Sequence, residues 1–278
     1  MSGISKVLSR SVAVAALLAS FIATAHADGK LQEVLSRGKL IVGTGSTNPP
    51  WGFQDKSGKL SGFDIDLAHI LAKGLFNDPD KVEFVTQSSD ARIPNITTGQ
   101  VDITCQAMTV TAPRAQQVAF TIPYYREGVG LLLKKGGKYA DFAAMKAAGS
   151  AVTVSVLQNV YAEDMVHQAL PGAKVDQFDN VGLMYQALNS GRADAAATDA
   201  SSLRWFMKQN PDRYADAGYG WNPQNYSCAV KQGDATWLQF VNTAIEQALT
   251  GVDYGDYKTA YETWFGVTPP APGIGFPR

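Results

Sequence analysis

The 278-residue sequence is poor in the residues that metal and nucleophile sites need. It has two cysteines and three histidines, and His26, His69 and His167 lie far apart in the chain. No Cys-x-x-Cys pair is present, so neither a zinc nor a haem site is expected. With so few histidines, no Ser-His-Asp or Cys-His set can be proposed either. The sequence therefore predicts no metal and no cofactor.

An excess of charge of one sign is also absent. The chain has 24 Lys and Arg against 25 Asp and Glu, for a formal net charge of -1. This balance gives no electrostatic reason to expect nucleic acid or an anionic membrane as a partner. The hydrophobic content of 45% is that of an ordinary globular protein.

Hydrophobic runs long enough to span a membrane are missing. One short run, Val12 to Ala23, follows Lys6 and Arg10 and precedes Ala25-His26-Ala27, a small-x-small cleavage pattern. A run of about 12 residues is too short to cross a hydrocarbon core of roughly 30 Å. Residues 1–27 are therefore expected to form a cleaved signal peptide, with a retained membrane helix as the alternative. The mature protein is expected in the periplasm, without insertion into the membrane.

The two cysteines, Cys105 and Cys228, would reach an oxidising compartment and are expected to pair. In the chain-entropy model, closing this loop removes about 5 kcal/mol of unfolded-state freedom. Two buried free thiols are the alternative.

Apolar runs of strand type alternate with longer segments of helical spacing, the rhythm of β-α-β units. Strands are expected at 40–43, 82–85, 101–105, 129–134, 151–156, 175–178, 193–198 and 226–230. Helices are expected at 62–75, 93–98, 112–118, 161–170, 182–190, 201–209 and 236–265, the last broken at Gly251. Two α/β lobes describe this order most economically. The proline-rich end, 269–278, is expected to pack on the surface or to be disordered.

Three strings carry a resemblance to a known family: GKLIVGTGSTNPPWGFQDKSGKLSGFDIDLAHILA, RIPNITTGQVDITCQAMTVTAPRAQQVAFTIPYY and YETWFG. In this order they resemble the extracellular solute-binding proteins of polar amino-acid ABC importers, from about Gly38 to Gly266. The resemblance implies the type II periplasmic binding protein fold, in which two α/β lobes joined by two hinge strands close on a ligand. It implies lobe 1 at 28–128 and 226–278, lobe 2 at 129–225, and crossings near 126–130 and 224–228.

The same resemblance implies the partners. It predicts a monomer that binds a free amino acid and hands it to the membrane permease of an ABC importer. Some periplasmic dehydratases share this fold, so a cyclohexadienyl or arogenate dehydratase-like enzyme is the alternative.

An amino acid presents a carboxylate and an ammonium, so a buried site needs a cationic donor and an anionic acceptor. The resemblance assigns Arg114 and Thr109 to the α-carboxylate, and Asp199 and the Ala107 carbonyl to the α-ammonium. Asp199 also closes an apolar run at the carboxyl end of an expected strand, where α/β sheets place ligands. The alternatives are a surface position for Arg114 and an N-cap role for Asp199.

Four other residues near the motifs are expected to be structural. Asp64 and Asp66 stand where a helix begins, which favours first-turn and capping roles. Trp51 and Phe53 flank a turn, and lobe packing is favoured over ligand stacking for both.

The ligand's side chain is predicted from a second set of residues. Arg92 and Ser89 match positions that meet the side-chain carboxylate in glutamate/aspartate-binding relatives, whereas Gly45 and Val181 replace two further basic residues. With Asn48 and Gln106 as neutral neighbours, the arginine can hold a carboxylate or an amide oxygen. Glutamate, aspartate, glutamine or asparagine is therefore expected. The alternative for Arg92 is a structural role at the helix start.

Two further expectations come from the resemblance. Asn159-Val160-Tyr161 replaces a Gly-Thr step of many relatives, so Tyr161 is expected either to replace the missing hydroxyl donor or to line the pocket. Cys105 and Cys228 occupy positions that match the disulfide of glutamate/aspartate-binding members.

Overall fold

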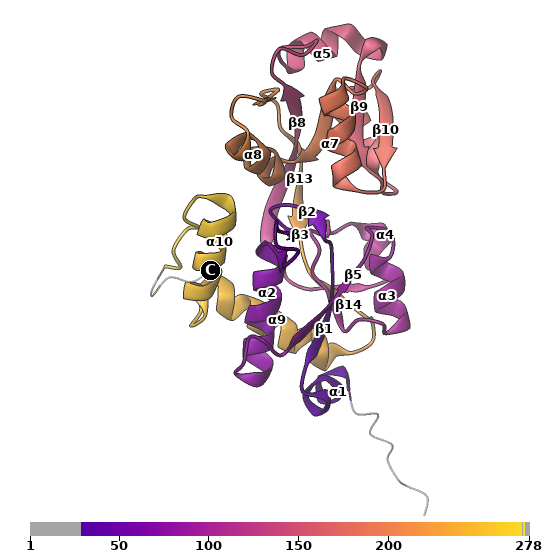
Figure 1. Ribbon diagram of the computed structural model, residues 1–278. Helices are drawn as coiled ribbons and strands as arrows, with labels where there is room; N and C mark the ends of the chain where they lie inside the picture. The colour runs from indigo at the N-terminus through magenta and orange to yellow at the C-terminus, as the bar shows by residue number, and fades with distance from the viewer. Residues whose placement is uncertain (1–28, 274, 276–278) are drawn as a thin grey trace, which may run out of the picture.

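The computed structural model describes residues 29–273 and 275, and it consists of two α/β lobes, each built around its own β-sheet (Figure 1). The two-lobed α/β fold expected from the sequence is confirmed. The expected signal peptide lies outside the described residues. Between residues 29 and 273, none of the helices has the length and apolar character needed to span a bilayer.

Lobe 1 contains a five-stranded sheet of order β5-β1-β6-β14-β7. Its strands are β1 (Leu40–Thr44), β5 (Val82–Thr86), β6 (Ile103–Thr104), β7 (Ala119–Phe120) and β14 (Ala229–Val230). β1 pairs in parallel with β5 and β6, whereas β14 runs antiparallel between β6 and β7. A strand from late in the chain thus completes a sheet made by its beginning.

Six helices and a small second sheet complete lobe 1. The helices are α1 (Lys30–Arg37), α2 (Phe63–Phe76), α3 (Arg92–Thr98), α4 (Ala112–Ala115), α9 (Ala235–Thr250) and α10 (Tyr254–Phe265). The small sheet consists of β2 (Thr47–Asn48), β3 (Gly52–Gln54) and β4 (Leu60–Ser61). Successive side chains of β1 point to opposite faces of the sheet and pack in two different hydrophobic clusters. Leu40 and Val42 pack with α2 and α9, whereas Ile41 packs toward Ile96 of α3.

Lobe 2 contains a sheet of order β10-β9-β11-β8-β12, with β13 beside β8. Its strands are β8 (Tyr125–Lys134), β9 (Thr153–Leu157), β10 (Lys174–Phe178), β11 (Ala195–Asp199), β12 (Tyr214–Asp216) and β13 (Trp221–Tyr226). The remaining elements are α5 (Phe142–Ala148), the 3-10 turn η1 (Gly149–Ala151), α6 (Ala162–Ala169), α7 (Val181–Ser190) and α8 (Ala200–Gln209). Leu131 and Leu133 of β8 face the core under α5 and α6, whereas Leu132 faces α7 and α8.

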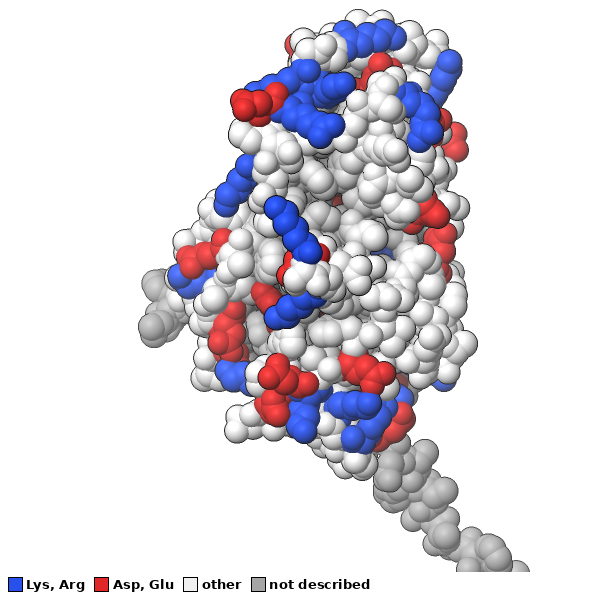
Figure 2. All heavy atoms as spheres, viewed as in Figure 1, with Lys and Arg blue, Asp and Glu red and all other residues white. Residues whose placement is uncertain are grey.

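Two strands run from one lobe to the other. β8 and β13 pair antiparallel, with Tyr125 opposite Tyr226 and Val129 opposite Trp221, and both cross between the lobes in Figure 1. On the face drawn in Figure 2, charged side chains gather at the two ends of the molecule and also lie at its left edge and centre, whereas the area to the right of the centre is mostly uncharged.

The structure corrects two expected elements. The single strand expected at 226–230 is two strands in different sheets, because the chain passes from β13 in lobe 2 to β14 in lobe 1 at Ser227 and Cys228. There the Cys228 N–H donates to Thr121 Oγ1 at 3.1 Å. The helix expected at 112–118 is the single turn α4, which ends at Ala115. Val118 lies beyond it and packs in a small hydrophobic cluster with Ile96 and Met108.

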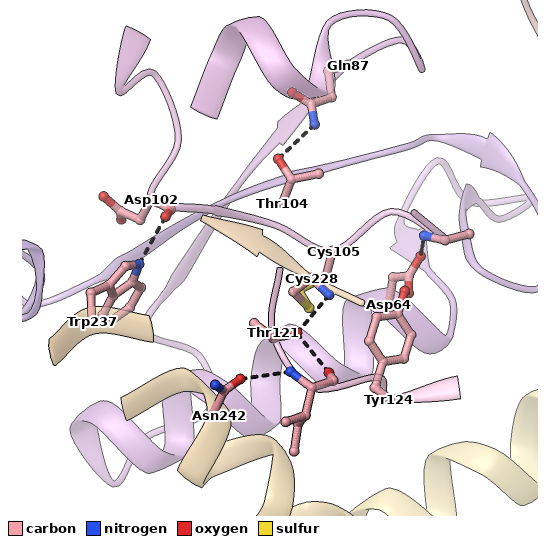
Figure 3. The surroundings of a disulfide bond; sticks show 12 residues. Asp64, Gln87, Asp102, Thr104, Cys105, Thr121, Tyr124, Cys228, Trp237 and Asn242 are labelled. Atoms are coloured by element: carbon pink, nitrogen blue, oxygen red, sulfur yellow. Dashed lines mark hydrogen bonds between the residues drawn. A yellow bond between two sulfur atoms is a disulfide. The ribbon is translucent and has the colours of Figure 1, made fainter. Parts of the chain in front are cut away.

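The expected disulfide is confirmed. Cys105, directly after β6, is bonded to Cys228, with an S–S distance of 2.03 Å (Figure 3). Both residues are fully buried. The bridge therefore joins two parts of lobe 1 that lie 123 residues apart in the chain, and it leaves lobe 2 free of any covalent tie to it apart from the connecting strands.

Candidate ligand-binding site

A cavity of about 570 Å³ lies between the two lobes and is lined by residues of both. Its volume falls within the usual range for small-molecule sites. All nine residues that the sequence predicted for the ligand line it: Asn48, Ser89, Arg92, Gln106, Ala107, Thr109, Arg114, Tyr161 and Asp199. Lobe 1 supplies all of them except Tyr161 and Asp199.

Arg114 reaches the cavity from α4, a helix that Thr111 starts by accepting a hydrogen bond from the Arg114 N–H. The Arg114 side chain is not at the surface, since only 8% of the residue is exposed, and its Nη1 donates to the Thr109 carbonyl at 2.9 Å. Burial lowers the pKa of its guanidinium. The guanidinium carbon lies 5.2 Å from the centre of the Tyr161 ring, which comes from lobe 2. The Thr111 hydroxyl lies 3.4 Å from the Tyr161 hydroxyl.

Asp199 ends β11 and occupies the N-cap position of α8, yet its side chain makes no capping hydrogen bond. Asp199 Oδ1 instead accepts a hydrogen bond from the Tyr226 hydroxyl of β13. Burial raises the pKa of the Asp199 carboxyl to about 6, against the opposing effects of that hydrogen bond and of the Arg92 charge. The N-cap alternative is therefore wrong for the side chain, which faces the cavity.

Asp64 differs most from expectation. The expected place in the first turn of α2 is confirmed for Asp64 and Asp66, but the capping role is wrong, because Gly62 is the N-cap and no side chain caps that helix. Asp64 is 1% exposed and lines the cavity; its Oδ2 accepts from the Ala107 N–H at 2.9 Å and its Oδ1 from the Tyr124 hydroxyl at 2.7 Å. Burial raises the pKa of its carboxyl to about 7. Asp66 accepts a hydrogen bond from Trp264 Nε1 at 2.6 Å, away from the cavity.

Arg92 both begins α3 and lines the cavity. It is 7% exposed; its Nε donates to the Ser89 carbonyl at 2.8 Å and its Nη1 to the Gln106 carbonyl at 3.1 Å. Burial, helped by the charge of Arg114, lowers the pKa of its guanidinium to about 10. The structural role offered as an alternative is thus present, in the same side chain that faces the cavity.

The sequence profile of the bacterial extracellular solute-binding proteins, family 3, matches residues 40–267. The chain belongs to this family. The L-cystine-binding protein TcyJ of Escherichia coli (strain K12) is 30% identical over 260 residues, which cover 92% of this chain and 93% of that protein. The ABC transporter glutamine-binding protein GlnH of Bacillus subtilis (strain 168) is 28% identical over 240 residues, covering 86% and 85%.

Solved structures agree with this assignment. An ancestral amino acid-binding protein, described as a precursor of cyclohexadienyl dehydratase, matches with a TM-score of 0.75 at 34% identity. The match covers 84% of this chain and 99% of that one.

In this solute-binding protein, direct contacts join the lobes beside the cavity. Trp51 Nε1 donates to Ser201 Oγ of α8 at 3.1 Å, and the Ser202 hydroxyl donates to the Pro49 carbonyl at 3.0 Å. Trp51 is buried and packs edge-on against Tyr125, which confirms the lobe packing favoured for it, and it also lines the cavity. Phe53 packs against Trp205 and Trp264 instead.

Several polar residues of the cavity were not foreseen. Gln87 follows β5, where its Nε2 donates to Gln106 Oε1 at 3.0 Å, and Gln224 of β13 accepts from the Thr109 hydroxyl at 2.7 Å. Gln87 could have been found, because it follows the carboxyl end of a parallel strand. Gln224 lies in the segment WNPQNY, whose polar composition and proline hide a strand.

Proposed function

We propose that this protein is the receptor of an ABC importer and binds one free L-amino acid in the cavity between its lobes. The observation that carries the proposal is the pair of oppositely charged side chains on that cavity, the buried Arg114 from lobe 1 and the partly buried Asp199 from lobe 2. A guanidinium suits a planar carboxylate, and a buried carboxylate suits an ammonium.

The division of charge between lobes supports a closing mechanism. A ligand of roughly ten heavy atoms reaches micromolar to nanomolar affinity only when nearly all of its polar atoms are satisfied. Because Arg114 and Asp199 belong to different lobes, a single small ligand meets both only when the lobes approach. Closure by rotation about β8 and β13 is therefore part of binding in this proposal.

Arg92 supports a polar ligand side chain. Its Nε and Nη1 are bonded to protein carbonyls, and within residues 29–273 its Nη2 makes no hydrogen bond. That nitrogen can donate to a carboxylate or an amide oxygen, so glutamate, aspartate, glutamine or asparagine is the proposed ligand class. Asn48 and Ser89 line the same cavity as neutral neighbours.

The proposed setting is the periplasm, with residues 1–27 removed as a signal peptide and a membrane permease as the recipient of the ligand. The family match and the relatives named for cystine and glutamine binding support this setting.

A thermal-shift screen of the twenty common L-amino acids tests the proposal. A ligand present at 100 times its dissociation constant stabilises the folded state by about 2.7 kcal/mol. We expect a shift with at least one of glutamate, aspartate, glutamine and asparagine. A largest shift with lysine or arginine and none with these four would overturn the side-chain proposal. No shift with any amino acid would overturn the receptor proposal.

A second candidate, a dehydratase-like enzyme, is favoured by one observation. Asp64 and Asp199 line the cavity with pKa values raised by burial to about 7 and about 6, as a general acid would require. Turnover of prephenate or arogenate by the purified protein would favour the enzyme over the receptor.

A further inference from the structure

One peptide group at the edge of the cavity is held from both sides by buried charges. The Gln106 carbonyl accepts from Arg92 Nη1 at 3.1 Å, and the Ala107 N–H donates to Asp64 Oδ2 at 2.9 Å. These are the two polar atoms of a single peptide unit. Arg92 belongs to α3 and Asp64 to α2, so two separate helices fix the orientation of this peptide unit.

The backbone at this point needs such support. Ala107 has φ of +43°, a region that residues other than glycine rarely adopt. Conformations of this kind persist where the surrounding structure determines them, and they concentrate at ligand sites. Ala107 itself lines the cavity, and the loop 106–109 leads directly to Thr109, whose carbonyl holds Arg114 at 2.9 Å.

The acid is itself held firmly. Tyr124 points its ring toward Asp64 in Figure 3, and its hydroxyl donates to Asp64 Oδ1 at 2.7 Å. The Tyr124 carbonyl accepts from the Tyr257 hydroxyl at 2.9 Å. The start of the loop is fixed by the Cys105–Cys228 disulfide, drawn in the same figure. Asp64 thus links the Gln106–Ala107 peptide, through hydrogen bonds, to Tyr124 and Tyr257 in the core of lobe 1.

We propose that Asp64 and Arg92 form a clamp, a pair of positioning residues that hold the Gln106–Ala107 peptide in a fixed orientation. The loop 106–109 can then present the Ala107 carbonyl to the ligand's ammonium. The proposal rests on the proposed amino-acid binding. It gives Asp64 a role in ligand affinity through geometry, with its charge facing the protein rather than the ligand.

The experiment compares four variants with the wild type. Asp64→Leu removes both hydrogen bonds, and Asp64→Asn keeps them, because the amide oxygen can accept from Ala107 and the amide N–H can donate to the Tyr124 oxygen. Asp66→Asn is the matched control, since Asp66 lies on the same helical turn and accepts one hydrogen bond away from the cavity. Tyr124→Phe removes the hydrogen bond that holds Asp64 Oδ1, and it replaces Asp64→Leu as the test variant if Asp64→Leu does not fold.

Two readouts are taken on each variant. The first is amide hydrogen exchange of residues 106–109 without ligand, and the second is affinity by titration with each of the twenty common L-amino acids and L-cystine. Losing a hydrogen bond to a buried charge predicts loop exchange and dissociation constants increased by roughly 10-fold to 100-fold in Asp64→Leu. We expect changes of about threefold or less in Asp64→Asn and Asp66→Asn, and intermediate values in Tyr124→Phe.

The outcomes separate the clamp from the proposed function. Unchanged loop exchange in both Asp64→Leu and Tyr124→Phe would overturn the clamp. Faster exchange with wild-type affinity would overturn its role in positioning. An Asp64→Asn variant as weak as Asp64→Leu, with wild-type loop exchange, would mean that the charge meets the ligand directly. If the wild type bound none of the 21 probes, the receptor proposal would fail, and exchange alone would decide whether the clamp exists.

Discussion

Glu127 on the connecting strand β8 predicts an unusual dependence of stability on pH. It is 5% exposed, its Oε1 accepts from the Gly128 N–H at 2.9 Å, and it lies near Asp199. Burial, followed by the charge of Asp199, raises the pKa of the Glu127 carboxyl from 4.5 to about 7. The folded protein therefore holds this proton more tightly than the unfolded chain does.

The direction and size of the change in the free energy of unfolding follow from the difference in proton binding between the folded and unfolded states. Between pH 4.5 and 7 the folded state binds more protons at Glu127 than the unfolded state, so the free energy of unfolding falls as the pH rises. A pKa raised to about 7 corresponds to about 3 kcal/mol lost across this window, with no further loss above it. Glutamine keeps an acceptor for Gly128 and cannot ionise. Glu127→Gln should therefore be about as stable as wild type at pH 5 and more stable by about 3 kcal/mol at pH 8.

Thermal unfolding of the ligand-free protein at pH 5, 6, 7 and 8 measures this difference. For a chain of this size, about 3 kcal/mol corresponds to an increase in Tm of roughly 6 to 12 °C at pH 8. Glu83→Gln is the control, because Glu83 is exposed and its ion pair with Lys39 lowers the pKa of its carboxyl. A Tm difference between Glu127→Gln and wild type that is the same at pH 5 and pH 8 would refute the reasoning.

Three further predictions concern the site and the disulfide. Arg114→Ala should weaken amino-acid binding by about 3 to 5 kcal/mol, more than a hundredfold, with little change in Tm without ligand, and near-wild-type calorimetric affinity would rule out its role. The ligand's ammonium favours the charged form of Asp199, and burial raises the pKa of that carboxyl to about 6, so binding at pH 5 should release a proton. Affinity should therefore be roughly tenfold weaker at pH 5 than at pH 7.5, and calorimetry that finds equal affinities would contradict this. Replacing Cys105 and Cys228 together with serine should lower the free energy of unfolding by about 2 to 5 kcal/mol in denaturant titration, and no loss would mean that the bridge adds no stability.

The sequence predicted most of the fold, since strongly periodic elements are set by burial. Helix α2 and strand β1 begin and end within about a residue or two of the expected bounds, because their apolar spacing is regular. The short strands β2, β3 and β4 were missed, because two or three residues carry no period. The break between β13 and β14 was also missed, because a change of sheet is a tertiary event with no local signal.

The site was predicted unevenly for a similar reason. Arg114 and Asp199, which motifs predicted, both line one cavity in the structure, and their part in ligand binding stays a proposal. Asp64 was misread as a capping residue, because its place at a helix start is local whereas its partners Ala107 and Tyr124 are distant in the chain. Gln224 was missed, because it meets Thr109 only where β13 runs beside the distant segment 108–110, with Thr109 bridged to Tyr226.

The most direct test of the central claim is a calorimetric comparison of one amino acid with its blocked forms. The amino acid that gives the largest thermal shift is titrated into the wild-type protein beside its N-acetyl derivative and its α-carboxamide. If Arg114 and Asp199 hold the two charged ends, the free amino acid should bind in the micromolar to nanomolar range and each blocked form more than a hundredfold more weakly. Equal affinity for the free and the blocked forms would contradict the account.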